Sequence, residues 1–176
     1  MLIASIGEEG IKKLEANMSK LISNVLKKEI THKEMIISIL SECISKLPEI
    51  TNIYAIFISL LGNSSFNFAF DIVKAIIKDL EKALNEGRIH FVRNYLNFFC
   101  DLVNCKILEQ KGLVDLFSQI TNVCINQQYF DLIYNVFYAL TRVDGSSLPN
   151  VEDITQYISS LNNKLQIFSK ETEYVN

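Results

Sequence analysis

Two histidines and four cysteines are the side chains of this sequence best suited to catalysis or metal binding. A histidine-based triad or proton relay needs an imidazole beside a serine, cysteine or aspartate, and nothing near His32 or His90 suggests such a pair. His32 follows a threonine suited to cap a helix, so we expect its ring to be exposed. His90 falls at the start of a predicted central helix, where we expect a half-buried, hydrogen-bonded ring. The histidines therefore indicate no catalytic base.

Metal and nucleotide motifs are equally weak. Glu29 and His32 have the Glu-x-x-His spacing of di-iron carboxylate bundles, but that chemistry needs a second such motif and two further glutamates. Cys100 and Cys105 are followed by no cysteine or histidine pair at zinc-site spacing, and glycine-rich phosphate loops are missing from the sequence. The sequence thus predicts no catalytic residue, cofactor or metal, and a protein that is not an enzyme. A helical-bundle metalloenzyme is the alternative from another class.

The four cysteines lie among apolar residues of helical segments, and no secretory signal precedes them. In that setting cysteines are usually reduced and buried, although their number would allow two disulfides. We therefore predict free, buried thiols at Cys43, Cys100, Cys105 and Cys124.

The charge and hydropathy of the chain argue against nucleic acids and membranes as direct partners. The formal net charge is −3 and the only arginines are Arg88, Arg93 and Arg142, so no basic face is available to neutralise a row of phosphates. The longest apolar run, residues 53–61, is about half of the roughly 20 residues that span a bilayer. Direct nucleic-acid binding and membrane insertion are therefore disfavoured, and we expect an intracellular protein.

Aromatic residues are abundant, with seven tyrosines and eleven phenylalanines. Most fall on apolar stripes with helical spacing, so we assign them to the core rather than to base stacking. Tyr134, Tyr138 and Tyr157 lie at stripe edges, where an amphipathic ring suits a protein contact.

The elements that position these residues are helices, because apolar residues recur at helical spacing in segment after segment. Thr31 and Glu34 form a capping-box pattern that predicts a helix start, and Pro48 predicts the next break. Gly62 and Gly87 are placed as left-handed caps of the following two helices.

Further helices are predicted after Gly87 and Gly112, and a last one carries the apolar residues of 151–168. The helix at residues 89–105 is apolar on two faces and should be central. Helix pairs starting near Thr31, Asn67 and Gly112 are spaced by roughly 40 residues, as in HEAT-type repeats. We predict an all-α chain of about eight helices, a short α-solenoid of antiparallel pairs forming one domain over residues 1–176.

Beyond this general pattern, specific residues resemble the first helical domain of the large subunit of nuclear cap-binding complexes. That domain belongs to the class named after the middle domain of translation initiation factor 4G. The resemblance covers nearly the whole chain and is most specific at residues 101–105. The matching residues are Tyr54, Leu60-Leu61, Phe66-Asn67-Phe68, Leu96 and Asp101-Leu102-Val103-Asn104-Cys105.

The resemblance implies a non-catalytic HEAT-like scaffold that supports cap-dependent mRNA processing, export and nonsense-mediated decay. The expected location is the nucleus, with shuttling to the cytoplasm as a further possibility. Its partners would be a small cap-binding subunit, held mainly by domains outside this chain, together with RNA-processing and export factors. Capped RNA would be bound only indirectly, and the chain would be the N-terminal domain of a longer protein. A scaffold domain of another translation, splicing or mRNA-decay factor is the alternative within the same fold class.

Two departures from the resemblance concern local surface. The family tends to carry a tryptophan near the position of Arg142, and this chain has no tryptophan. Its glycine-rich helix start is Ala69-Phe70 here. For Asp101 and Asn104 we predict a structural role, as polar groups near a helix C-terminus that close turns inside the stack.

Overall fold

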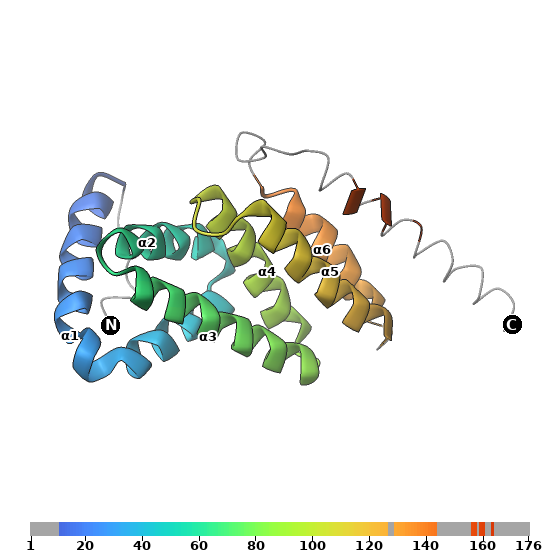
Figure 1. The fold of residues 1–176 in the computed structure, drawn as a ribbon, viewed down its shortest axis with the longest axis horizontal. Coiled ribbons are helices and arrows are strands. Elements are labelled where there is room, and N and C mark those ends of the chain that lie inside the picture. The colour runs from blue at the N-terminus through green and yellow to red at the C-terminus, as the bar shows by residue number, and fades with distance from the viewer. Residues whose placement is uncertain (1–10, 127–128, 144–155, 158, 161–162, 164–176) are drawn as a thin grey trace, which may run out of the picture.

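The computed structural model of this protein describes residues 11–126, 129–143, 156–157, 159–160 and 163. Helices make up the ordered elements of these residues, as Figure 1 shows. They are α1 (Ile11–Lys46), the short 3-10 helix η2 (Pro48–Ile50), α2 (Thr51–Ser64), α3 (Phe66–Asn85), α4 (Ile89–Asn104), α5 (Gln110–Asn126) and α6 (Phe130–Leu140). The predicted all-α class is confirmed, and the predicted last helix at 151–168 lies largely outside the described residues.

The first helix is kinked at His32, whose φ of −135° and ψ of 20° are not helical. The helix start predicted at Thr31 is therefore present as a kink at His32, one residue later, and the capping hydrogen bond is different. The Thr31 hydroxyl donates back to the carbonyl oxygen of Lys28 at 3.4 Å, so it extends the preceding turn instead of capping the next one.

Pro48 lies at the start of η2, where a missing backbone donor is tolerated. Around this break the chain turns by 105° between Thr31–Lys46 and Pro48–Ser64. The prediction of a left-handed cap at Gly62 is wrong, because α2 continues to Ser64 and Gly62 is an ordinary helical residue. Its position faces Ala69 of α3, whose Cβ would lie 3.5 Å from an added Cβ, so a small residue brings the two helices close.

The predicted cap at Gly87 is confirmed by its φ of +66°. The amide of Arg88 donates to the carbonyl oxygen of Ala83, and the amide of Gly87 donates to that of Leu84. These two hydrogen bonds form a Schellman motif, which satisfies the last carbonyls of α3 and reverses the chain into α4.

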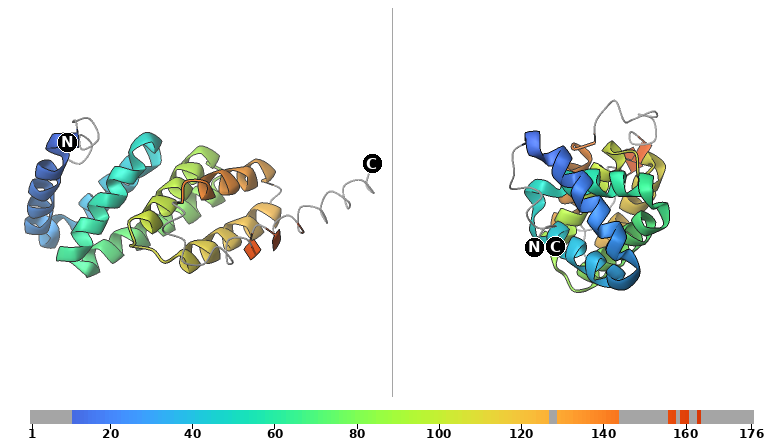
Figure 2. Two further views of the ribbon diagram at one scale, coloured as in Figure 1. Left: turned by 90° about the horizontal axis from the view of Figure 1, so that it is seen from above. Right: turned by 90° about the vertical axis from the view of Figure 1, so that its left-hand side faces the viewer.

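The helices form a row of antiparallel pairs, seen most clearly in the left view of Figure 2. Cross-links between neighbouring pairs join residues 38 positions apart: Lys33 of α1 to Asp71 of α3, and Ser41 of α1 to Asp79 of α3. Because both ends of each link advance together, the second half of α1 runs parallel to α3. The structural offset of 38 residues refines the repeat of roughly 40 that was predicted.

The core is continuous along this row, and α4 is its centre. Every residue of 94–103 is buried, and α4 contacts α1, α2, α3, α5 and α6. The prediction of a central helix covered on two sides is thus confirmed. Cys43, Cys100 and Cys124 are buried free thiols as predicted, whereas the free thiol of Cys105 is half-buried.

None of the described helices is by itself long and apolar enough to cross a bilayer. Only the bent pair Thr31–Lys46 and Pro48–Ser64 meets the length and composition requirement, and it does so only when both members are counted together.

The two glycines provide a matched test of these helix ends. Gly87→Ala should lower the free energy of unfolding by about 1–2 kcal/mol, because alanine is strained in the left-handed region. Gly62→Ala should raise it by up to about 1 kcal/mol, since alanine favours the helix and meets only ordinary van der Waals contact. Urea denaturation of both variants measures this difference. A destabilised Gly62→Ala variant with an unchanged Gly87→Ala variant would contradict the assigned helix ends.

Candidate partner-binding surfaces

The two histidines lie apart on the surface. His32 is exposed as predicted, but the prediction that His90 is half-buried is wrong: its ring is exposed and rests against Phe91, with ring centroids 4.2 Å apart. Among the described residues, no three His, Cys, Asp or Glu side chains come together in a way that could hold a metal ion.

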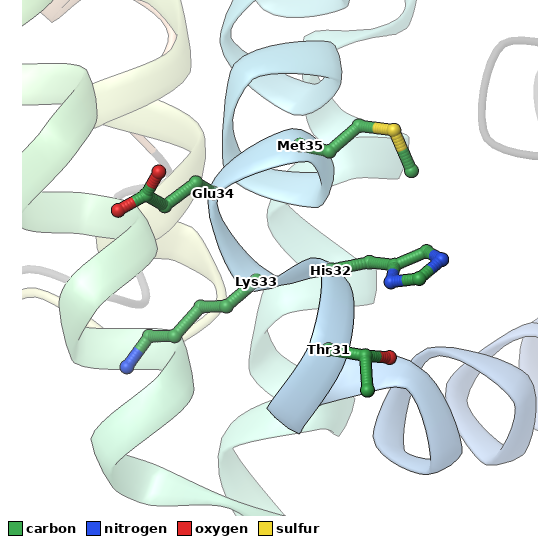
Figure 3. A pocket seen from close by; sticks show the side chains of 5 residues that line it. All are labelled: Thr31, His32, Lys33, Glu34 and Met35. Carbon is green, nitrogen blue, oxygen red and sulfur yellow. The ribbon is translucent and has the colours of Figure 1, made fainter.

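The kink of α1 forms a surface hollow lined by residues 31–35. In Figure 3 the side chains of His32 and Met35 point to one side of the helix, whereas Lys33 points the opposite way, toward α3. Lys33 forms an ion pair with Asp71, so it ties α1 to α3. The hollow thus offers an exposed thioether and an imidazole beside the side chains of Lys33 and Glu34.

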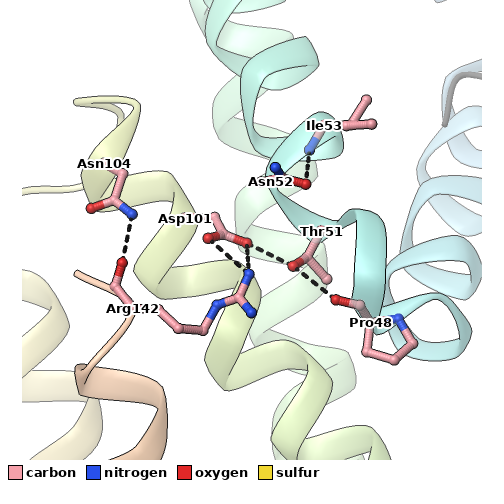
Figure 4. A network of polar contacts seen from close by, with 7 residues as sticks. All are labelled: Pro48, Thr51, Asn52, Ile53, Asp101, Asn104 and Arg142. Atoms are coloured by element: carbon pink, nitrogen blue, oxygen red, sulfur yellow. Dashed lines mark hydrogen bonds and ion pairs between the residues drawn. The ribbon is translucent and has the colours of Figure 1, made fainter. Parts of the chain in front are cut away.

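A buried polar junction lies where three helix pairs meet, near the C-terminal end of α4 (Figure 4). The Asp101 carboxylate accepts a hydrogen bond of 2.6 Å from the Thr51 hydroxyl at the start of α2. Its two oxygens also lie 3.2 and 3.1 Å from Nη2 of Arg142, just beyond α6. One turn further along α4, the Asn104 side-chain amide donates to the Arg142 carbonyl oxygen at 2.9 Å.

The electrostatics of this junction are a balance between burial and hydrogen bonding. Burial raises the pKa of Asp101, against the opposing effects of the Thr51 hydroxyl and the Arg142 guanidinium. Burial also raises the pKa of the neighbouring Cys100 thiol, which is therefore a poor nucleophile. The junction is consequently built to hold helices together and is not equipped to activate a thiol.

Asp101 and Asn104 were expected to close turns within the stack. In the structure their side chains form hydrogen bonds to residues of other helix pairs. Their partners, Thr51 and Arg142, lie 50 and 41 residues from Asp101 and were not foreseen. No spacing rule links positions so far apart, so only the packing of α2 and α6 on α4 reveals them. The Arg142 guanidinium contacts the buried Asp101 carboxylate with Nη2.

Exposed aromatic residues mark two separate faces. On α6, Tyr134 and Tyr138 are 70% and 55% exposed, in keeping with their predicted position at a stripe edge. Tyr157 is buried instead, and its hydroxyl lies 2.8 Å from that of Thr121, so its expected role in a surface contact is wrong.

The second face was missed in the sequence. Phe66 and Phe70 of α3 are 73% and 57% exposed, and their rings stack with centroids 6.3 Å apart. The signal that could have revealed them is their spacing, because they lie one turn apart and off the buried stripe of Ala69, Ile72 and Ile76.

Comparison with known proteins identifies relatives of this chain by sequence. No protein-family model matches the chain. Nuclear cap-binding protein subunit 1 of Aedes aegypti is 32% identical over 122 residues, which are 69% of this chain and 15% of that protein. The chain is a distant, partial homologue of nuclear cap-binding protein subunit 1.

Two further relatives carry the same description. The Anopheles gambiae protein is 30% identical over 122 residues, covering 69% of this chain and 15% of the relative. The Salmo salar protein is 30% identical over 161 residues, covering 87% of this chain and 20% of the relative. The chain therefore spans a fifth or less of the length of these curated relatives.

The junction can be tested with a nearly isosteric change. Thr51→Val removes the hydroxyl that donates to Asp101, and should lower the free energy of unfolding by about 1–3 kcal/mol because a buried carboxylate loses a donor. Thr31→Val is the matched control, since that hydroxyl is exposed and bonds only within its own helix. Chemical denaturation at neutral pH gives both values. Equal and small effects of the two changes would contradict a stabilising role for the junction.

Proposed function

We propose that this chain is a non-catalytic scaffold domain in nuclear, cap-dependent mRNA metabolism, equivalent to the first helical domain of a large cap-binding subunit. The observation that carries the proposal is the homology to nuclear cap-binding protein subunit 1, found in three relatives and extending over as much as 87% of the chain. In this proposal the chain works through contacts with protein partners, and a small cap-binding subunit holds the capped RNA.

The structure supports a scaffold in two ways. A core that runs along the whole row of helix pairs keeps their outer faces in fixed relative positions, as in other helical-repeat proteins that bind partners. The aromatic side chains that are most exposed in the described part of the chain lie on α3 and α6. These exposed rings provide apolar contact sites on the outer faces of the row.

A chimera tests the proposal. The segment of the Salmo salar protein that matches this chain would be replaced by the chain, and the product would be mixed with the small cap-binding subunit and RNA-processing factors. We expect the chimera to be retained on cap-analogue resin and to recover protein partners that are lost when the segment is deleted. A chimera that recovers no more partners than the deletion variant would contradict the proposed scaffold role.

The chain alone provides the complementary measurement. Because the chain has a net charge of −3 with only three arginines, and its cap-binding partner is a separate subunit in this proposal, calorimetric titration with a methylated cap analogue should show no binding. Micromolar affinity for the analogue would place cap recognition in this chain and contradict the indirect role.

A further inference from the structure

The exposed face of α3 carries four residues at successive one-turn intervals: Phe66, Phe70, Lys74 and Lys78. We call these four residues the α3 stripe. All four are exposed, and the two phenylalanines stack on each other with an angle of 20° between their ring planes. Two large apolar rings in contact on a helix surface are costly to leave in water and favour a binding partner.

The two lysines of the stripe form no ion pair with the residues that the structure describes. The carboxylate nearest to Phe70 on the same helix, Asp71, is bound to Lys33 of α1. Neither Lys74 nor Lys78 forms an ion pair with another residue that the structure describes, and Glu81, one turn beyond, is likewise unpaired among these residues. The stripe therefore presents an apolar end followed by two available ammonium groups.

We propose that the α3 stripe binds an extended peptide segment of a protein partner, with two apolar side chains followed by two acidic ones at alternate positions. This inference rests on the proposed scaffold function and names the chemistry of one docking surface. Apolar anchors would cover the rings of Phe66 and Phe70, and carboxylates would pair with Lys74 and Lys78.

The spacing of the stripe fits an extended partner. Residues four apart on a helix are separated by about 6 Å along its axis. Alternate residues of an extended chain point to the same side and are about 6.6 Å apart. The four residues form a row that is inclined by about 26° to the axis of α3. An extended segment that lies along this inclined row can contact all four in turn, whichever direction it runs.

A single-stranded nucleic acid is the competing class, because bases stack on aromatic rings and lysines contact phosphates. Two observations favour the peptide. The stripe offers only two cations on a chain of net charge −3, which gives little gain from counterion release. The two rings also stack against each other, which leaves less ring face open to bases.

The probe is a fluorescein-labelled nine-residue peptide with leucine, tryptophan and two glutamates at alternate positions separated by serines, and a second peptide of reversed sequence. Fluorescence anisotropy with the full chain should show saturable binding of at least one of them with a Kd below about 1 mM. Replacing both glutamates by glutamine, or raising the salt concentration, should weaken binding because charge pairing at an exposed surface is screened.

Two double variants locate the surface. Phe66→Ser with Phe70→Ser, and separately Lys74→Glu with Lys78→Glu, should each weaken binding at least about tenfold. Tyr134→Ser with Tyr138→Ser is the matched control, since these tyrosines are also exposed and one turn apart, but the next residue in that series, Arg142, is bound to Asp101. Thermal melts by circular dichroism confirm that each variant is folded.

The inference is overturned if neither peptide saturates, if the tyrosine variant loses as much affinity as the phenylalanine variant, or if an oligouridine binds the stripe more tightly than the peptides. Failure of the peptide with success of the chimera described above removes this surface and leaves the scaffold function in place. If the peptide binds and the chimera recovers no partners, the α3 stripe remains a peptide-binding surface and the proposed scaffold function is removed.

Discussion

The burial of one carboxylate constrains much of this structure. Asp101 lies near the C-terminal end of α4, in a stretch where every residue is buried, and an ionised group there must find donors within the protein. α4 itself supplies none of the hydrogen bonds seen at this carboxylate. They come from Thr51 at the start of α2 and from Arg142 beyond α6, so the helix pairs on both sides must pack in one register to satisfy it.

Other features of the fold are consistent with that requirement. The turn at Pro48 brings Thr51 to the start of α2, and the Schellman motif at Gly87 reverses the chain so that α4 packs against α3. Cross-links between α1 and α3 repeat the offset of 38 residues that also relates Asn104 to Arg142. The apolar core supplies the main stabilisation, whereas the polar contacts specify which turns face one another.

Local sequence patterns predicted the helices and the central position of α4, because apolar periodicity is a property of neighbouring residues. Predictions that depended on tertiary packing fared less well. Gly62 has the residue type of a cap but is used for close approach to Ala69, and Tyr157 lies at a stripe edge but is buried against α5. Likewise, the sequence identified Asp101 and Asn104 as structural, yet their partners could be found only in three dimensions.

The polar junction and the exposed phenylalanines of α3 lie on different elements. The junction joins α4 to Thr51 of α2 and to Arg142 beyond α6, whereas Phe66 and Phe70 project from α3. If this junction couples the stabilities of the helix pairs, the coupling should be measurable in the chain alone, without any partner.

Native-state hydrogen exchange in the Asp101→Ala variant tests that coupling most directly. If Asp101 joins the helix pairs, the free energy of opening should fall together for the amides of α2, α4 and α6, while the first half of α1 changes much less. A loss of protection confined to α4, with α2 and α6 exchanging as in the unaltered protein, would contradict the account.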